Sequence, residues 1–329
     1  MIAIVWGHAV MPDVITANKF FAAFRIPFFF IMAGYLLNIH QWGGVENYKK
    51  FAMKLIKRLL LPYFIAEILF YPIWFVVCHE MGRLNYSLHK LAELNPLETF
   101  TAIFIGNGND SNLILGVLWF LPALLCAEII FIQLYNRLNE FGAEIFTLSV
   151  VVAAYLGFNI KNLFALPLGL DIALVAQIFL LVGVLIRKYN LIERTGLMTC
   201  AALTFILVFV SYFNERIDMN CRIYGNVLMF YAGGISGTLL VMKFSALMTA
   251  GKIFSLISDC GRQSMMILVL HPIILNVAYE IIVDALNFPA EKIFTDTAVV
   301  FFVTAAGVFI PLFVAKKFGR LPVLKYFCA

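Results

Sequence analysis

The sequence predicts an all-α membrane protein, a polytopic bundle of about ten transmembrane helices. Hydrophobic residues make up 63% of the chain and charged residues only 13%, against roughly 45 to 50% and 25% in soluble domains. The apolar residues gather in runs that approach the length of about 20 residues needed to cross a bilayer. Ten spans leave no room for a sizeable soluble domain in 329 residues, so we expect one integral-membrane domain over residues 1–329.

Ten apolar runs are expected to form the spans. They cover residues 1–11, 20–39, 62–78, 113–135, 143–158, 170–186, 196–213, 224–242, 263–283 and 294–315. The first run would reach only about 17 Å as a helix, against a hydrocarbon core of about 30 Å, so we expect this span to be truncated at its N-terminal end. The longest polar segment, residues 79–112, is expected to be a loop.

Lysine and arginine are distributed unevenly between the predicted loops. When the loop 40–58 is placed in the cytoplasm and the sides alternate, sixteen basic residues fall inside and six outside, with Lys19 and Arg25 at the outer end of the second span. Cytoplasmic loops carry such an excess. Both chain ends are therefore predicted to be cytoplasmic. The net charge of +5 reflects this topology, and no nucleic-acid partner is implied.

Two polar residues stand out in the first two apolar runs. Arg25 would cost roughly 2.5 to 3.5 kcal/mol at the bilayer centre on insertion scales. His8 is of the residue type that takes up and returns a proton near neutral pH. We expect the two side chains to face each other across a water-filled or substrate-filled cavity. The alternatives are a structural histidine hydrogen-bonded to a neighbouring helix and an arginine that reaches the outer headgroups.

Five motifs follow one another along the chain. They are Gly7-His8; Arg25 with Pro27-Phe28-Phe29-Phe30 and Gly34-Tyr35-Leu36; Lys57-Arg58 with Leu61-Pro62-Tyr63; Leu118-Trp119-Phe120-Leu121; and Leu270-His271-Pro272. In order and spacing they resemble the membrane-bound acyltransferase 3 family, whose members transfer acyl groups, usually acetyl, to hydroxyls of sugars, polysaccharides or other acceptors. Two features depart from the family. Its arginine about ten residues before the histidine would precede Met1, and its paired inner arginines appear here as Lys54, Lys57 and Arg58.

The resemblance implies an O-acyltransferase of the bacterial cytoplasmic (inner) membrane, with acetyl-CoA or another acyl-CoA as donor. The acceptor would be a hydroxyl of a sugar, a polysaccharide or a lipid-linked glycan. Since a thioester is already activated, the enzyme must mainly deprotonate the hydroxyl and stabilise the oxyanion. His8 is expected to be the general base and Arg25 its electrostatic partner; an acetyl-histidine intermediate is an alternative. Acyl-CoA is a substrate here, and no tightly bound cofactor is expected.

Further residues are assigned secondary roles. Lys54, Lys57 and Arg58 lie at helical spacing, either to bind the phosphates of CoA or to anchor the helix at anionic lipid. Asp13, Trp119 and His271 are candidates to line the cavity, although Trp119 has the character of a packing residue. Glu67 and Glu128, inside predicted spans, are expected to face protein and not lipid. The six cysteines are scattered without metal-ligand spacing, so no metal site is predicted.

Two other functions are compatible with the residues alone. In a transporter or flippase, His8, Arg25 and His271 would line a proton or substrate pathway. In a structural or regulatory membrane protein that has lost activity, replacing His8 or Arg25 would change no phenotype. Release of free CoA that depends on an acceptor distinguishes the enzyme from both.

Overall fold

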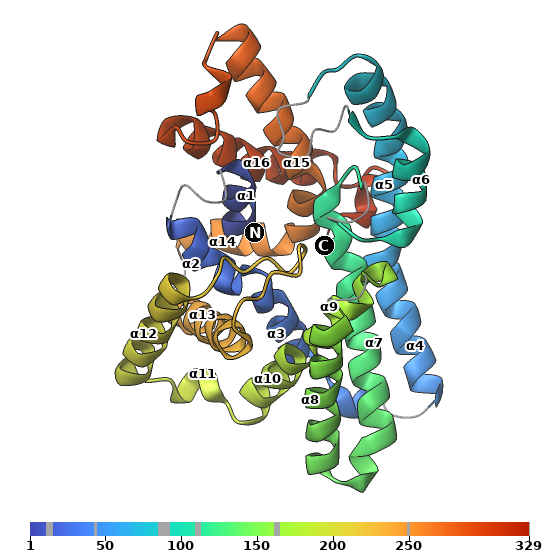
Figure 1. Cartoon of the computed structure of the whole chain (residues 1–329), viewed down its shortest axis with the longest axis vertical. Coiled ribbons are helices and arrows are strands. Elements are labelled where there is room, and N and C mark those ends of the chain that lie inside the picture. The colour runs from blue at the N-terminus through green and yellow to red at the C-terminus, as the bar shows by residue number, and fades with distance from the viewer. Residues whose placement is uncertain are drawn as a thin grey trace. The chain divides into compact units, whose positions relative to one another are not determined.

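The computed structural model describes residues 1–10, 16–42, 45–84, 93–108, 113–160, 165–248 and 251–328. Every regular element within these ranges is a helix, so the all-α prediction is confirmed (Figure 1). The α-helices are α1 (Ile2–Ala9), α2 (Thr16–Arg25), α3 (Pro27–Leu36), α4 (Val45–Leu55), α5 (Leu61–Trp74), α6 (Pro96–Ile105), α7 (Phe120–Leu138), α8 (Ala143–Ile160), α9 (Leu170–Val175), α10 (Gln177–Lys188), α11 (Leu191–Arg194), α12 (Leu197–Phe213), α13 (Val227–Leu247), α14 (Lys252–Arg262), α15 (Ser264–Glu280) and α16 (Thr297–Phe318). Shorter turns are the π-helical η2 (Ile56–Leu60), η3 (Phe75–Glu80) and η8 (Ile281–Ala285) and the 3₁₀ turns η1 (Ile39–Trp42), η5 (Gly116–Trp119), η6 (Asn139–Phe141), η7 (Pro167–Gly169), η9 (Ala290–Lys292) and η10 (Leu324–Tyr326).

Each of the ten predicted spans contains a helix. Within the described residues, seven helical stretches are long and apolar enough to cross a membrane, and the pair Pro167–Val175 and Gln177–Lys188, bent by 54°, makes an eighth when it is counted as one span. The other two predicted spans correspond to α1, with 8 residues, and α12, with 17. The difference from ten therefore lies in these two helices, which are shorter than the roughly 20 residues needed to cross a bilayer.

Two segments that were expected to be loops are helical. Helix α6 lies within the predicted loop 79–112. Asn95 caps its start by accepting hydrogen bonds from the amides of Leu97 and Glu98, and Gly106 ends it with a φ of 69°. The predicted loop 40–58 is also largely helical, because one helical stretch of 35 residues runs from Glu46 to Glu80. The predicted boundary at Pro62 is absent, and the π-helical turn η2 directly precedes this proline.

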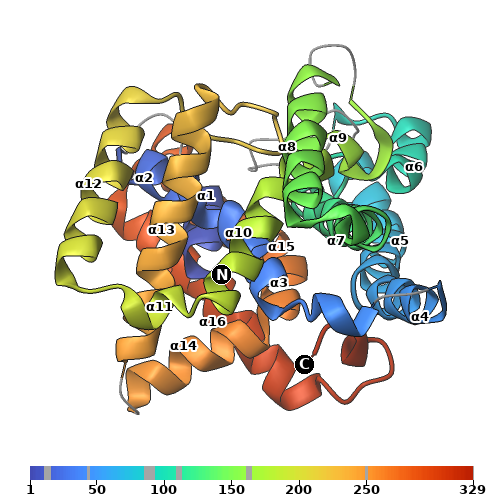
Figure 2. The ribbon, with the colours of Figure 1, turned by 90° about the horizontal axis from the view of Figure 1, so that it is seen from below.

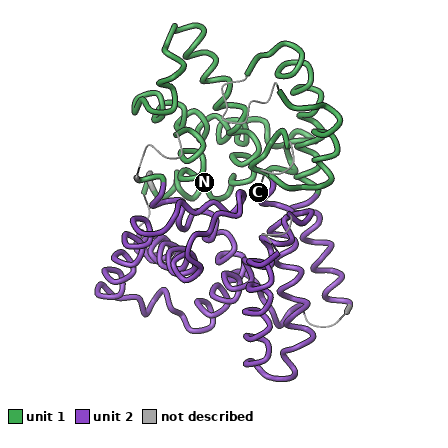
Figure 3. Tube along the Cα trace, viewed as in Figure 1, with its two compact units in different colours: residues 1–18, 61–118, 249–329 green, residues 19–60, 119–248 purple. Residues whose placement is uncertain are grey.

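The contacts divide the chain into two compact units (Figure 3). Unit 1 comprises residues 1–18, 61–118 and 249–329, and unit 2 comprises residues 19–60 and 119–248. In unit 1, α1 packs on α15 and α16, and α5 packs on α6. In unit 2, α3 lies against α10 and α13, and α12 lies against α13 (Figure 2). The single domain predicted for residues 1–329 stays a prediction.

Side-chain contacts near the ends of predicted spans join segments that the charge pattern predicts on the same side of the membrane. Lys19 donates to the carbonyl of Tyr212, and both lie at predicted outer ends. Lys243 donates to the carbonyl of Ile192, and both lie on the predicted inner side. Arg83 pairs with Glu280 at a predicted outer end. The alternation of the loops and the cytoplasmic position of both chain ends stay predictions.

Glycines allow α3 and α10 to approach each other closely. A Cβ atom at Gly34 would meet the backbone of Leu180, and one at Gly183 would meet the backbone of Ile31 and Tyr35. Between helices in lipid, small residues provide the close packing that replaces the hydrophobic driving force.

We therefore predict that Gly34→Ala and Gly183→Ala each destabilise the protein by about 1 to 3 kcal/mol, the usual cost of overpacking. The melting temperature of the detergent-solubilised protein measures this effect. Gly261→Ala in α14 is the matched control, because nothing lies within 4 Å of the added Cβ, and it should melt like the unmodified protein. Equal melting temperatures for all three variants would exclude the close contact.

Candidate functional site

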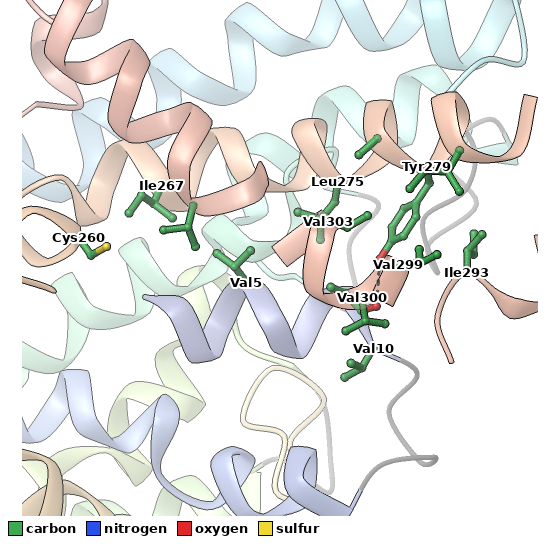
Figure 4. Close-up of a cluster of buried hydrophobic side chains, with 14 residues drawn as sticks. Val5, Val10, Cys260, Ile267, Leu275, Tyr279, Ile293, Val299, Val300 and Val303 are labelled. Atoms are coloured by element: carbon green, nitrogen blue, oxygen red, sulfur yellow. Dashed lines mark hydrogen bonds between the residues drawn. The ribbon is translucent and has the colours of Figure 1, made fainter. Parts of the chain in front are cut away.

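Helix α1 is held in place by α15 and α16 within unit 1. Val5, Ala9 and Val10 are 0% exposed and belong to the apolar cluster drawn in Figure 4. The Tyr279 hydroxyl on α15 donates a 3.0 Å hydrogen bond to the carbonyl of Ala9, shown as a dashed line in the same figure. These contacts fix the C-terminal end of α1, where His8 lies.

His8 and His271 meet within unit 1. Their ring centroids are 5.4 Å apart and their planes are tilted by 44°. His271 on α15 is 0% exposed, whereas His8 is exposed. The structure thus brings together two of the predicted site residues, one accessible from outside the protein and one buried behind it.

The hydrogen bonding of His271 determines its tautomer. Its Nδ1 lies 2.8 Å from the carbonyl oxygen of Ile267, four residues earlier on α15. Because a carbonyl oxygen only accepts, Nδ1 carries the proton and Nε2 presents its lone pair. This Nε2 is buried, and it has no hydrogen-bond partner within the described residues. A buried acceptor nitrogen beside His8 can accept a hydrogen bond from a donor that lies next to it.

This arrangement is suited to proton transfer. The exposed His8 can take a proton from a bound hydroxyl. The charge that then develops on its ring lies close to the neutral His271, whose free Nε2 accepts hydrogen bonds. A neutral neighbour that accepts a hydrogen bond stabilises the His8 imidazolium and places no second positive charge beside it.

Arg25 lies at the C-terminal end of α2, in unit 2. Ile26 separates α2 from α3 but keeps helical dihedrals, with φ −86° and ψ −47°, so residues Ala17–Leu36 run on as one helical stretch. Asp218 and Arg216 are close enough to interact with Arg25 electrostatically. His8 belongs to unit 1 and Arg25 to unit 2. The expected meeting of His8 and Arg25 stays a prediction.

The predicted inner basic residues Lys54, Lys57 and Arg58 are all exposed. Arg58 has a carboxylate partner, since its Nη2 lies 2.7 Å from Oε1 of the buried Glu128 on α7. The Lys54 ammonium lies 5.5 Å from the centre of the Trp42 ring, within the usual range of a cation–π contact. The π-helical turn η2 places Lys57 and Arg58 off the regular helical spacing assumed from the sequence.

The comparison with protein families decides the class of the protein. A family model described as an acyltransferase domain, that of acyltransferase 3, matches residues 1–316. The chain belongs to the acyltransferase 3 family. No curated protein and no solved structure was found that matches it. Family membership and the multiple apolar helices together make the chain a multi-pass membrane acyltransferase.

Other predicted residues of this acyltransferase have clear places in the structure. Trp119 is 5% exposed and its ring lies edge-on to that of Phe120, with ring centroids 6.1 Å apart. Its predicted role, in packing or in lining the cavity, stays a prediction. Glu67 and Glu128 are 0% and 3% exposed, which confirms that they face protein. Asp13 lies outside the described residues.

The sequence analysis missed a buried ion pair of this acyltransferase. Arg222 binds Asp171 through two nitrogens, Nε at 2.6 Å from Oδ2 and Nη2 at 3.3 Å from Oδ1. Asp171 begins a predicted span at its outer end, and Arg222 lies in a predicted outer loop. A carboxylate inside an apolar helix requires a partner, so an acidic residue at this position and an arginine on the same side were the available signal.

Proposed function

We propose that the protein is an O-acyltransferase that moves an acyl group, typically acetyl, from acyl-CoA to a hydroxyl of a sugar or of a lipid-linked or cell-surface glycan. The observation that carries the proposal is the pair of His8 and His271, an exposed imidazole beside a buried one with a free acceptor nitrogen. Family membership supplies the reaction class. The proposed location is the bacterial cytoplasmic membrane.

The proposed step proceeds by direct attack. His8 removes the proton of the acceptor hydroxyl while the hydroxyl oxygen forms a bond to the thioester carbonyl carbon. The carbon–sulfur bond then breaks, CoA leaves as a thiolate, and the proton passes from His8 to the thiolate sulfur. Atoms and charges balance, since one ester and one free thiol are formed. Arg25 is proposed to stabilise the oxyanion of the intermediate.

The donor is proposed to bind at the inner basic residues. Arg58 is paired with Glu128, whereas Lys54 and Lys57 are exposed to solvent. The phosphates of CoA can be bound by the compact charge of a lysine ammonium as well as by the planar guanidinium of an arginine. Lysines therefore suffice where charge alone is needed. Arg58 then acts as a positioning residue that ties this part of the helix to α7.

The lysines give a first test of the function. In proteoliposomes supplied with acetyl-CoA and a membrane glycan extract, the unmodified protein is expected to release free CoA only when the extract is present. Lys54→Gln and Lys57→Gln are expected to raise the KM for acetyl-CoA about fivefold each, as for an exposed charge pair of about 1 kcal/mol, with kcat little changed. A thiol-reactive reagent measures the CoA.

The control is Lys188→Gln, another exposed lysine of a predicted inner loop, which should leave the KM unchanged. An equal rise in KM for all three variants would show that only overall charge matters and would remove the lysines from the donor site. If acetyl-CoA stays intact while a solute crosses the membrane, the protein is a transporter and the proposal is wrong.

A further inference from the structure

Helices α5 and α6 of unit 1 pack side by side (Figures 1 and 2). The Tyr63 hydroxyl on α5 donates a 2.7 Å hydrogen bond to the carbonyl of Ile103 on α6. Two turns further along α5, the Tyr71 hydroxyl donates to the carbonyl of Pro96 at 3.0 Å. Since the contacts run forward on α5 and backward on α6, the two helices are antiparallel, and two tyrosines fix their register.

Glu67 and Thr99 lie at the middle of this interface. Glu67 lies one helical turn from each of the two tyrosines and therefore shares their face of α5. Thr99 lies within about one turn of both carbonyls that accept from the tyrosines, on the corresponding face of α6. Both residues are 0% exposed. The register therefore places a carboxyl and a hydroxyl at the same level between the two helices.

The polar atoms at this level have few hydrogen bonds. Glu67 Oε2 lies 3.5 Å from the amide nitrogen of Leu115, at the long limit of a hydrogen bond. Glu67 Oε1 and Thr99 Oγ1 are buried, and neither has a hydrogen-bond partner within the described residues. An ionised carboxyl in such surroundings would be a buried charge without a counter-charge, and taking up a proton removes that cost.

The other buried glutamate of a predicted span has different surroundings. Glu128 on α7, in unit 2, is 3% exposed, and its Oε1 lies 2.7 Å from Nη2 of Arg58. Its negative charge is therefore compensated by a guanidinium group. For Glu67, the Leu115 amide is the partner found in the part of the chain that the structure describes, and no cationic side chain is paired with it there.

Ionisable groups are sparse on the main neighbours of α5. Glu98 on α6 is exposed and precedes Thr99, so it lies outside the interface. The segment 113–118, which supplies the Leu115 amide, contains no ionisable side chain. In η3, which continues α5, the ionisable residues begin at Cys78, about three helical turns beyond Glu67. On α5 itself, the two tyrosines donate their hydroxyl protons to backbone carbonyls.

We propose that Glu67 and Thr99 form a proton-binding site between α5 and α6, in which Glu67 carries a proton at neutral pH and donates it in a hydrogen bond to the Thr99 hydroxyl. A protonated carboxyl group has one O–H donor, and a threonine hydroxyl can accept from it. The terminal torsion of glutamate is soft, so Oε1 can turn toward the hydroxyl. Carboxyl groups inside spans are a component of proton pathways. The site does not depend on the proposed acyl transfer.

Infrared spectroscopy of the detergent-solubilised protein at neutral pH tests the site without measuring activity. A protonated carboxyl group absorbs at a higher frequency than the amide I band, whereas a carboxylate absorbs at a lower frequency. The spectrum of the unmodified protein minus that of Glu67→Gln is expected to contain one carboxylic-acid band. Thr99→Val removes the hydrogen-bond acceptor and should shift this band to higher frequency.

Two matched variants serve as controls. Glu128→Gln should lose a carboxylate band and no carboxylic-acid band, because Glu128 is paired with Arg58. Thr101→Val, on the exposed side of α6 with its hydroxyl bonded to the carbonyl of Glu98, should leave the Glu67 band in place.

Folding of each variant is verified by size-exclusion chromatography and by its melting temperature. Glu67→Gln replaces a neutral acid by a neutral amide of similar shape and should melt like the unmodified protein. If it does not fold, the comparison of Thr99→Val with the unmodified protein decides the result. A carboxylate band in the Glu67→Gln difference spectrum, or a carboxylic-acid band that Thr99→Val does not shift, overturns the proposal.

Discussion

Replacing His8 by alanine is expected to lower the rate of acyl transfer by about 10²- to 10⁴-fold, the range that a positioned general base contributes. The loss should appear in kcat, because His8 acts on the proton of the acceptor and not on the binding of the donor. Acceptor-dependent release of CoA in proteoliposomes measures it. His8 is exposed and contributes no buried side chain to the cluster around α1, so the variant should stay folded.

His271 provides the comparison within the same pair. His271→Leu removes the acceptor nitrogen behind His8 and should lower kcat less than His8→Ala does. His271→Asn can keep a side-chain acceptor and should recover part of that loss. The double replacement of His8 and His271 should be no slower than His8→Ala alone, since residues that act as a unit are not additive. Independent, multiplicative losses would show that the two imidazoles do not work together.

Breaking the buried ion pair between Asp171 and Arg222 is expected to cost about 3 to 5 kcal/mol of stability, because one charge would be left buried without a partner. Asp171→Ala is the direct test, measured as a lower melting temperature. Asp171 also accepts from the amide of Leu166 at 3.3 Å. The substitution therefore loosens the start of α9 as well.

Two further variants separate this ion pair from ordinary surface charge. Asp284→Asn removes a carboxylate that is 44% exposed and lies 3.4 Å from Arg83, so it should change stability by no more than about 1 kcal/mol. Asp171→Leu combined with Arg222→Met removes both charges and should recover much of the lost stability. Equal melting temperatures for Asp171→Ala and Asp284→Asn would show that the Asp171 carboxylate is not buried against Arg222.

The helices could be predicted from the sequence because the hydropathy and the length of an apolar run are properties of a single stretch of chain. Each predicted span contains a helix, and Glu67 and Glu128 are buried as expected. Helix α6 was missed, although the Asn95-Pro96 start and the Gly106 end were readable signals. Its apolar run of 10 residues is too short to register as a span.

The partners of the site residues could not be predicted in the same way. His8 and His271 lie at opposite ends of the chain, and their contact depends on how α1 packs against α15 and α16. The pairing of Arg58 with Glu128 depends equally on the packing of η2 against α7. Sequence spacing describes neighbours on one helix, whereas both contacts join different helices.

Chemical rescue of His8→Ala by imidazole tests the central role of His8 most directly. Acyl transfer from acetyl-CoA by the variant is measured in proteoliposomes with increasing imidazole at fixed pH. If the missing group is a base, the rate should rise with the concentration of neutral imidazole and should do so only when the acceptor is present. A variant that transfers acyl groups as fast as the unmodified protein without imidazole would contradict the assignment of His8 as the base.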